Sequence, residues 1–181
     1  ATQGLAGVSA SQVEIQSGIQ FYDGITTAEI QEILIKSASD LIDLEHPNYQ
    51  FVAARLLLFS VRKSLYGRSR ELPELEDHIV KCVGQEVYDG DIYSKYSKED
   101  IEKANGYIDH NRDFLFTYAG LRQVVDKYLV QDRSTGQVYE TPQFMYMMIA
   151  LTIFAEYPKE TRLNYVRRYY DAISRHRINI P

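Results

Sequence analysis

Two polar side chains in the N-terminal part of the chain could hold a phosphate between them. Thr27 lies at or beside the start of a predicted helix, where backbone N–H groups and the helix dipole attract anions. Lys63 lies near the end of a later predicted helix and could supply a cation if the two helices converge. The structural alternative is that Thr27 caps its helix and Lys63 extends its ammonium group into solvent. Spacing alone favours this simpler interpretation.

The other chemistry-bearing residues lack the neighbours that catalysis or metal binding needs. No CxxC, HExxH, GxSxG or P-loop motif occurs in the chain. The single cysteine, Cys82, lies on an apolar helical face, which is typical of a buried structural thiol. The four histidines are scattered, without the spacing of a metal site. We therefore predict no catalytic residue and no metal ligand in this chain.

Two charged segments have both a functional and a structural interpretation. The acidic residues within 71–77 could act as paired carboxylates, but a solvated helix face is favoured. The arginine- and tyrosine-rich segment 159–175 could contact phosphates and stack on bases. An amphipathic helix with inward-packing tyrosines is favoured there, because the chain has a net charge of −5 and is a poor general phosphate binder.

Composition excludes several classes of protein. The chain has 181 residues, of which 45% are hydrophobic and 25% charged, so it is too apolar for disorder and can fill a core. No stretch approaches the ~20 apolar residues of a membrane span, and no secretory signal is visible. One cysteine fits a reducing compartment. We expect a cytoplasmic helical domain with neither a membrane nor a nucleic acid as partner.

The expected elements are mainly helical. Thr26 with Glu29 is a capping-box pattern, and Ser97 begins a second one. Gly67 is the expected C-terminal cap of the helix before it. Two β-prone runs, 128–130 and 137–139, flank a turn that contains Gly and predict one short hairpin. Helices are expected over 11–21, 26–42, 49–66, 73–83, 101–108, 116–127, 142–154 and 159–175, with a polar linker at 68–72 and the start of a strand at 178–181.

A series of sequence blocks in a particular order and spacing points to one protein family. The blocks are Gln20-Phe21-Tyr22-Asp23-Gly24-Ile25 with Thr27, Tyr49-Gln50, Ala53-Ala54-Arg55, Arg62-Lys63, Tyr66-Gly67, Ile108-Asp109-His110, Arg112-Asp113, Lys127-Tyr128-Leu129-Val130-Gln131, Thr135-Gly136, Tyr139-Glu140, Tyr157-Pro158, Glu160-Thr161-Arg162-Leu163 and Tyr169-Tyr170-Asp171-Ala172. Together they resemble the N-terminal region of the large subunit of class I ribonucleotide reductase. The likeness covers essentially the whole chain and is strongest to the class Ia type of enteric bacteria and their phages.

The resemblance implies a mainly α fold with two parts. Residues 1–67 would form a partial ATP-cone, which binds ATP or dATP as an allosteric effector. It would pack on a helical domain over 68–181 that carries the short β-hairpin. Thr27 and Lys63 match nucleotide-contact positions of the family, and Gln31 and Phe59 are further candidates. Gln31 stands where the enteric enzyme has a histidine near the nucleotide sugar, and glutamine keeps hydrogen bonding but cannot become cationic.

The family reduces ribonucleoside diphosphates to deoxyribonucleotides by radical chemistry. By this resemblance the chain would begin inside the cone, near the end of its first helix, and stop before the catalytic barrel with its redox cysteines. It would contribute nucleotide sensing and scaffolding. Its expected partners are the rest of the large subunit and a small radical-bearing subunit, in a homodimer or higher oligomer. The alternatives are a stand-alone helical interaction domain that binds no nucleotide, and an enzyme in its own right.

Overall fold

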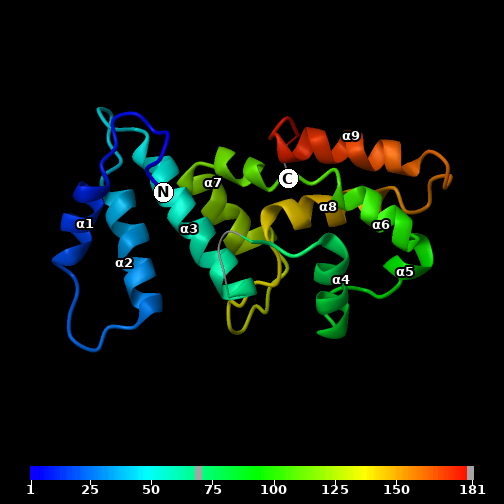
Figure 1. Cartoon of the computed structure of the whole chain (residues 1–181), viewed down its shortest axis with the longest axis horizontal. Coiled ribbons are helices and arrows are strands. Elements are labelled where there is room, and N and C mark those ends of the chain that lie inside the picture. Colours follow the sequence, from blue (N-terminus) through cyan, green and yellow to red (C-terminus); the bar gives the residue numbers. More distant parts are fainter. Residues whose placement is uncertain (68–70, 179–181) are drawn as a thin grey trace. The chain divides into compact units, whose positions relative to one another are not determined.

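The computed structural model describes residues 1–67 and 71–178, and the regular elements within these ranges are helices (Figure 1). The chain divides into two compact units, each assembled from two stretches of sequence. Unit 1 comprises Ala1–Arg70 and Phe114–Lys127, and unit 2 comprises Glu71–Asp113 and Tyr128–Pro181. The expectation of a mainly α fold is confirmed. The functional boundary between residues 67 and 68 stays a prediction.

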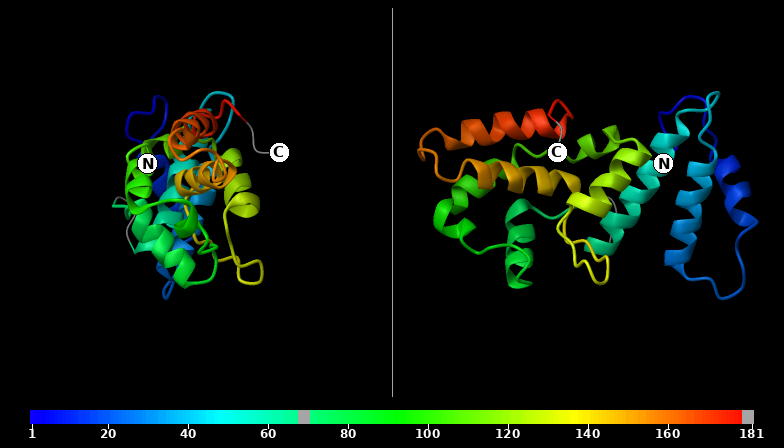
Figure 2. Two further views of the ribbon diagram at one scale, coloured as in Figure 1. Left: turned by 90° about the vertical axis from the view of Figure 1, so that its right-hand side faces the viewer. Right: turned by 180° about the vertical axis from the view of Figure 1, so that it is seen from behind.

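Unit 1 is a small helical bundle. Its helices are α1 (Ala10–Gly18), α2 (Thr27–Asp40), α3 (Tyr49–Tyr66) and α7 (Tyr118–Gln123). The second helix packs against both α1 and α3, and α7 packs against α3. Figures 1 and 2 show α1 and α2 side by side. The core of this unit is a cluster of Val13, Ala38, Tyr49, Val52 and Ala53.

Local signals set the ends of α2 and α3. The predicted capping box is present, since the Thr26 hydroxyl accepts the Glu29 N–H at 3.2 Å and the Glu29 carboxylate accepts the Thr26 N–H at 2.8 Å. The third helix ends, as predicted, at Gly67, whose φ of 72° is left-handed and whose N–H bonds the Lys63 carbonyl at 2.9 Å. These ends place Thr27 in the first turn of α2 and Lys63 in the last turn of α3.

Five α-helices lie in the described part of unit 2. They are α4 (Leu75–Gly84), α5 (Ile92–Lys95), α6 (Lys98–Asn105), α8 (Pro142–Ile153) and α9 (Arg162–Ser174), and the 3-10 helix η1 (His110–Leu115) leads out of this unit. The α8 helix packs along α9 (Figure 2), and α6 contacts both α4 and α9. Phe144, Met147 and Leu151 of α8 are fully buried, so α8 is the central helix of this unit.

A buried polar chain crosses the interior of unit 2. His78 stacks on Phe144 with ring centroids 4.2 Å apart, and its Nε2 lies 3.1 Å from the Tyr88 hydroxyl. The same hydroxyl donates to the carboxylate of Glu140. Cys82, one turn after His78, is fully buried, which confirms its interpretation as a buried structural thiol.

The predicted β-hairpin is wrong as a pair of strands. The described residues contain no strand, and the segment keeps a single antiparallel bridge between Gln131 and Val138. One reason is that the chain continues from α7 into a π-helical turn, η2 (Val124–Tyr128), which removes the first residue of the predicted β run. The other is that the Val130 N–H donates to the Glu140 carboxylate at 2.8 Å instead of to a facing backbone carbonyl.

The other predicted helices are present with shifted ends. The last helix begins at Arg162, later than predicted, because Pro158–Thr161 closes a turn in which the Thr161 N–H bonds the Pro158 carbonyl at 3.0 Å. Ser97 caps α6 through the predicted capping box. The predicted linker and terminal strand fall partly on residues 68–70 and 179–181, which lie outside the described residues.

Candidate functional site

The N-terminus of α2 is the first half of the candidate phosphate site. Thr27 is the first residue of this helix and is exposed, so its backbone N–H is among those left without an intrahelical partner. The Glu29 carboxylate already lies at this helix end, where it accepts from the Thr26 hydroxyl at 2.7 Å and from the Tyr22 hydroxyl at 2.9 Å. Thr26 and Tyr22 hold the pKa of Glu29 below its usual value through these hydrogen bonds. A phosphate here would have to share the helix end with this carboxylate.

Gln31 lies one turn after Thr27 on the same face of α2. Its side chain is half-buried, and its Oε1 is 3.4 Å from the Ser60 hydroxyl of α3. Since residues 41–48 return the chain between the two helices, α2 and α3 are antiparallel, and the start of α2 faces the later turns of α3. The Gln31–Ser60 contact therefore joins one predicted residue of α2 to the position of α3 that directly follows Phe59.

Phe59 and Lys63 lie one turn apart on α3, on either side of Ser60 in sequence. Lys63 is exposed and forms no ion pair within the described part of the chain. Phe59 is half-buried and meets Phe114 edge to face, with ring centroids 6.2 Å apart. The structure thus brings Gln31 to the segment that carries Phe59 and Lys63, but it shows no direct contact between Thr27 and Lys63 within the described residues.

Sequence reasoning missed an arginine and aromatic cluster on the same helix. The guanidinium groups of Arg55 and Arg62 lie 5.7 and 5.6 Å from the centre of the Phe114 ring. With Phe59, the two arginines recur at positions i, i+4 and i+7 of α3, a spacing that could have revealed their shared face. The ring between them comes from a distant part of the sequence, which no local pattern indicates. This cluster anchors the side of α3 on which Phe59 lies.

No group of three or more His, Cys, Asp and Glu side chains is arranged to hold a metal ion in residues 1–67 and 71–178. Over the same ranges, no helix combines the length and the apolar character that crossing a bilayer requires. The backbone N–H groups at the start of α2 and the Lys63 ammonium suit an anionic ligand, which would share this end of α2 with the Glu29 carboxylate.

Two family models match the chain. The ATP cone domain matches residues 5–64, which contain α1, α2 and nearly all of α3. The all-alpha domain of ribonucleotide reductase matches residues 114–181, which contain α7, α8 and α9. The four predicted nucleotide-binding residues therefore all fall inside the ATP-cone match.

Curated relatives match over the whole chain. The chain is 49% identical to the ribonucleoside-diphosphate reductase 1 subunit alpha of Escherichia coli, over 100% of this chain and 24% of the relative. It is 49% identical to the corresponding alpha subunit of Haemophilus influenzae over the same shares of both chains. It is 45% identical to that of Enterobacteria phage T4, over 97% of this chain and 23% of the relative. The chain thus spans about a quarter of the length of the relatives it matches.

Proposed function

We propose that this chain senses ATP or dATP for a ribonucleoside-diphosphate reductase. The proposal starts from its homology to the N-terminal region of the alpha subunits of such enzymes. The observation that carries the proposal is the position of the ATP-cone match. It coincides with the α2–α3 pair, on which Thr27, Gln31, Phe59 and Lys63 occupy facing segments. An ATP cone implies allosteric regulation by a nucleotide.

Each residue has a role that its chemistry supports. The Thr27 hydroxyl and the N–H groups at the start of α2 would bind the phosphates, where the helix dipole favours negative charge. The Lys63 ammonium would add a charge-assisted hydrogen bond to them. Gln31, fixed beside Ser60, would bond a polar group of the sugar or base, and Phe59 would offer an aromatic surface to the base.

The wider role follows from the whole reductase. The chain would act as part of an oxidoreductase that converts ribonucleoside diphosphates to deoxyribonucleotides in the cytoplasm. Its partners would be the rest of the large subunit and a small radical-bearing subunit, in a homodimer or higher oligomer. Binding of ATP or dATP would shift the population of these assemblies by the difference in its affinity for each of them.

Calorimetric titration with ATP and with dATP tests the sensing role. The titration is run on this chain and on a polypeptide of the length of its relatives. Lys63→Ala is expected to weaken nucleotide binding by about 1–3 kcal/mol, roughly 5- to 150-fold, because a charge-assisted hydrogen bond is lost. The matched control is Lys36→Ala, which removes another exposed lysine of unit 1 whose partner is Asp40 of the same helix. Absence of binding to both polypeptides would exclude the sensing role.

Two observations favour a second function, a helical interaction domain without nucleotide binding. The Glu29 carboxylate already lies at the anion-binding end of α2. In addition, Ile15 and Ile19 on and after α1 are 68% and 80% exposed, as in a surface that contacts another protein. The two functions separate in the same titration, because a pure interaction domain gives no heat with nucleotide and is insensitive to Lys63→Ala.

A further inference from the structure

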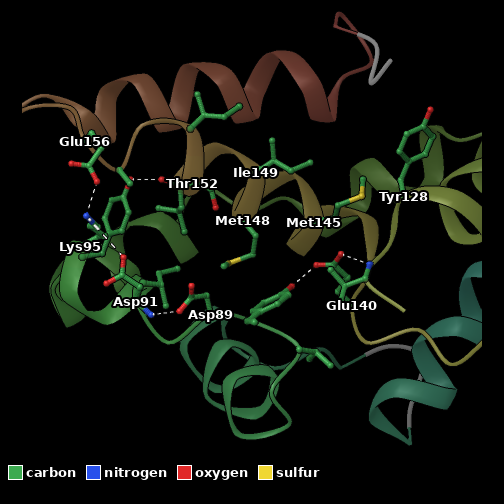
Figure 3. Close-up of a pocket in the computed structure, with 18 residues that line it drawn as sticks. Asp89, Asp91, Lys95, Tyr128, Glu140, Met145, Met148, Ile149, Thr152 and Glu156 are labelled. Atoms are coloured by element: carbon green, nitrogen blue, oxygen red, sulfur yellow. Dashed lines mark hydrogen bonds and ion pairs between the residues drawn. The ribbon is translucent and has the colours of Figure 1, made fainter. Parts of the chain in front are cut away.

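A cavity of about 660 Å³ lies wholly within unit 2 (Figure 3). One wall is α8, and the other is the segment from Val87 to Tyr96, which includes α5. This volume lies within the ~300–1,000 Å³ typical of small-molecule sites. The cavity shares no residue with the proposed nucleotide site.

The walls of the cavity are mostly apolar. Met145, Met148 and Ile149 line it from α8, and Ile92 and Tyr96 line it from the facing segment. Tyr96 is held in place by its hydroxyl, which donates to the Leu151 carbonyl at 2.7 Å. Methionine side chains are flexible and polarisable, so such a wall adapts to apolar groups of different shape.

Acidic side chains gather at one end of the cavity. Figure 3 shows Asp91 and Glu156 at this end, with Asp89 next to Asp91 on the side toward Met148, and Met145, Glu140 and Tyr128 at the other end. Lys95 lies among the acids and is already paired, with its Nζ 2.6 Å from Glu156 and 4.0 Å from Asp91. Three carboxylates against one lysine leave this end of the cavity with a net negative charge.

The opposite end has a polar group that is already bonded. Glu140 is buried, accepts the Val130 N–H at 2.8 Å and accepts the Tyr88 hydroxyl. Burial raises the pKa of Glu140, which disfavours its charged form. The electrostatic preference of the cavity therefore comes from its acidic end, and the methionine wall is free to accept an apolar body.

We propose that this cavity binds a small organic cation with an apolar body. The ammonium group lies at the end formed by Asp89, Asp91 and Glu156, and the apolar part runs along Met148 toward Met145. The volume of the cavity limits the ligand to a small molecule, the methionine wall favours an apolar body, and the negative charge at one end favours a cation. The site is independent of the nucleotide-sensing role, so either can fail without the other.

The chain contains three methionines, which makes the test specific. In protein labelled with ¹³C at the methionine methyl groups, Met145 and Met148 report on the cavity, while the fully buried Met147 does not line it and serves as an internal control. The probe is 4-phenylbutylamine, compared with 4-phenylbutanol and 5-phenylpentanoate. We expect the amine to shift the Met145 and Met148 signals saturably, the alcohol to bind at least fivefold more weakly, and the carboxylate to bind more weakly still.

Two variants and one control locate the site. Asp89→Asn keeps the acceptor for the Asp91 N–H, a 2.9 Å bond in the wild type, but removes a charge, and is expected to weaken amine binding severalfold. Thr152→Trp, an exposed lining position, fills the cavity and is expected to abolish binding. Glu102→Gln removes an exposed carboxylate of α6 that does not line the cavity, and should leave binding unchanged.

Three outcomes would overturn the proposal. Equal affinity for the amine and the alcohol would show an apolar cavity without preference for a cation. Unchanged Met145 and Met148 signals at millimolar amine would show that no small cation binds. Shifts produced by a lysine-rich peptide but not by the amine would identify the surface as a protein-docking site instead.

Discussion

The ion pair between Arg162 and Asp100 should contribute strongly to the stability of unit 2. The Arg162 side chain is only 3% exposed, and its Nη2 lies 2.8 Å from Asp100 Oδ2. The guanidinium also lies over the Tyr96 ring, 4.1 Å from its centre. Because Asp100 accepts the Ser97 N–H at the start of α6, this pair joins α9 to the capped end of α6.

Arg162→Met removes the charge and keeps an unbranched side chain. Removing one partner of a buried ion pair typically costs about 3–5 kcal/mol, because the other charge is left in a medium of low polarity. Two observations lower this figure. The Asp100 side chain is 20% exposed and can regain water, and the Arg162 Nε is buried without a hydrogen-bond partner, so its loss removes one unsatisfied donor. We therefore expect a loss of about 2–3 kcal/mol in the free energy of unfolding.

Urea unfolding followed by circular dichroism measures this loss. A double-mutant cycle with Asp100→Asn should give a coupling energy of at least about 1 kcal/mol. The control is Arg175→Met, since Arg175 is 49% exposed and 4.0 Å from Asp171, and it should change stability by less than about 0.5 kcal/mol. The reasoning is refuted if Arg162→Met lies within the range of that control, or if the coupling energy is near zero.

The pH dependence of the same pair provides a second check. Burial raises the pKa of Asp100, but hydrogen bonds from Arg162 and Ser97 outweigh it and leave the pKa below its ordinary 3.8. The unfolded chain therefore binds the proton first as the pH falls. The stabilisation is present above the unfolded pKa and is lost as the pH falls through the folded one, so wild type and Arg162→Met should converge in stability below about pH 4.

Three further predictions follow from the described contacts. Thr26→Ala should destabilise α2 by about 1 kcal/mol, measured by amide hydrogen exchange in that helix, and Thr26→Ser should restore it; equal protection in all three proteins would contradict the capping role. Burial raises the pKa of Cys82 to about 11, so its thiol should react with a disulfide reagent at pH 8 roughly 100-fold more slowly in the native protein than in urea. A fast reaction of the native protein would show that Cys82 is accessible to solvent. Burial lowers the pKa of His78 to about 3, so the unfolded chain takes up this proton before the folded chain does as the pH falls. The free energy of unfolding of wild type, compared with that of His78→Gln, should therefore decrease as the pH falls from about 6.5 toward 3. A constant difference between the two proteins in urea titrations across this pH range would refute the prediction.

Most of the fold was predictable because its signals are local. The Thr26–Glu29 and Ser97–Asp100 capping boxes and the left-handed Gly67 depend on neighbours a few residues away, and all three caps are present. The start of α6 was predicted at residue 101, whereas Ser97 caps a helix that begins at Lys98. The hairpin prediction was wrong because a side chain and a π-helical turn replace part of the backbone pairing. Glu140 takes the Val130 N–H through its side chain, and no alternation of apolar and polar residues can indicate that competition.

The candidate site was predictable only in part. Thr27 and Lys63 were identified by their positions at helix ends, which the structure bears out. Ser60 was missed, because its contact with Gln31 depends on how α2 packs against α3. Glu29 was recognised as a capping residue, but sequence reasoning did not reveal that its carboxylate also accepts the Tyr22 hydroxyl at the helix end where a phosphate would bind.

The interleaving of the two units along the chain limits how the nucleotide module can be transplanted. The segment that matches the ATP cone, residues 5–64, is continuous in sequence, but α7, which packs against α3, is encoded in the separate stretch 114–127. Tyr118 of α7 also packs against the core cluster of unit 1. A recombination event or an engineered fusion that moves the first segment alone would leave that face of α3 in water. A transferred segment that folds on its own would therefore have to include α7, or the protein that receives it would have to supply another helix at this face of α3.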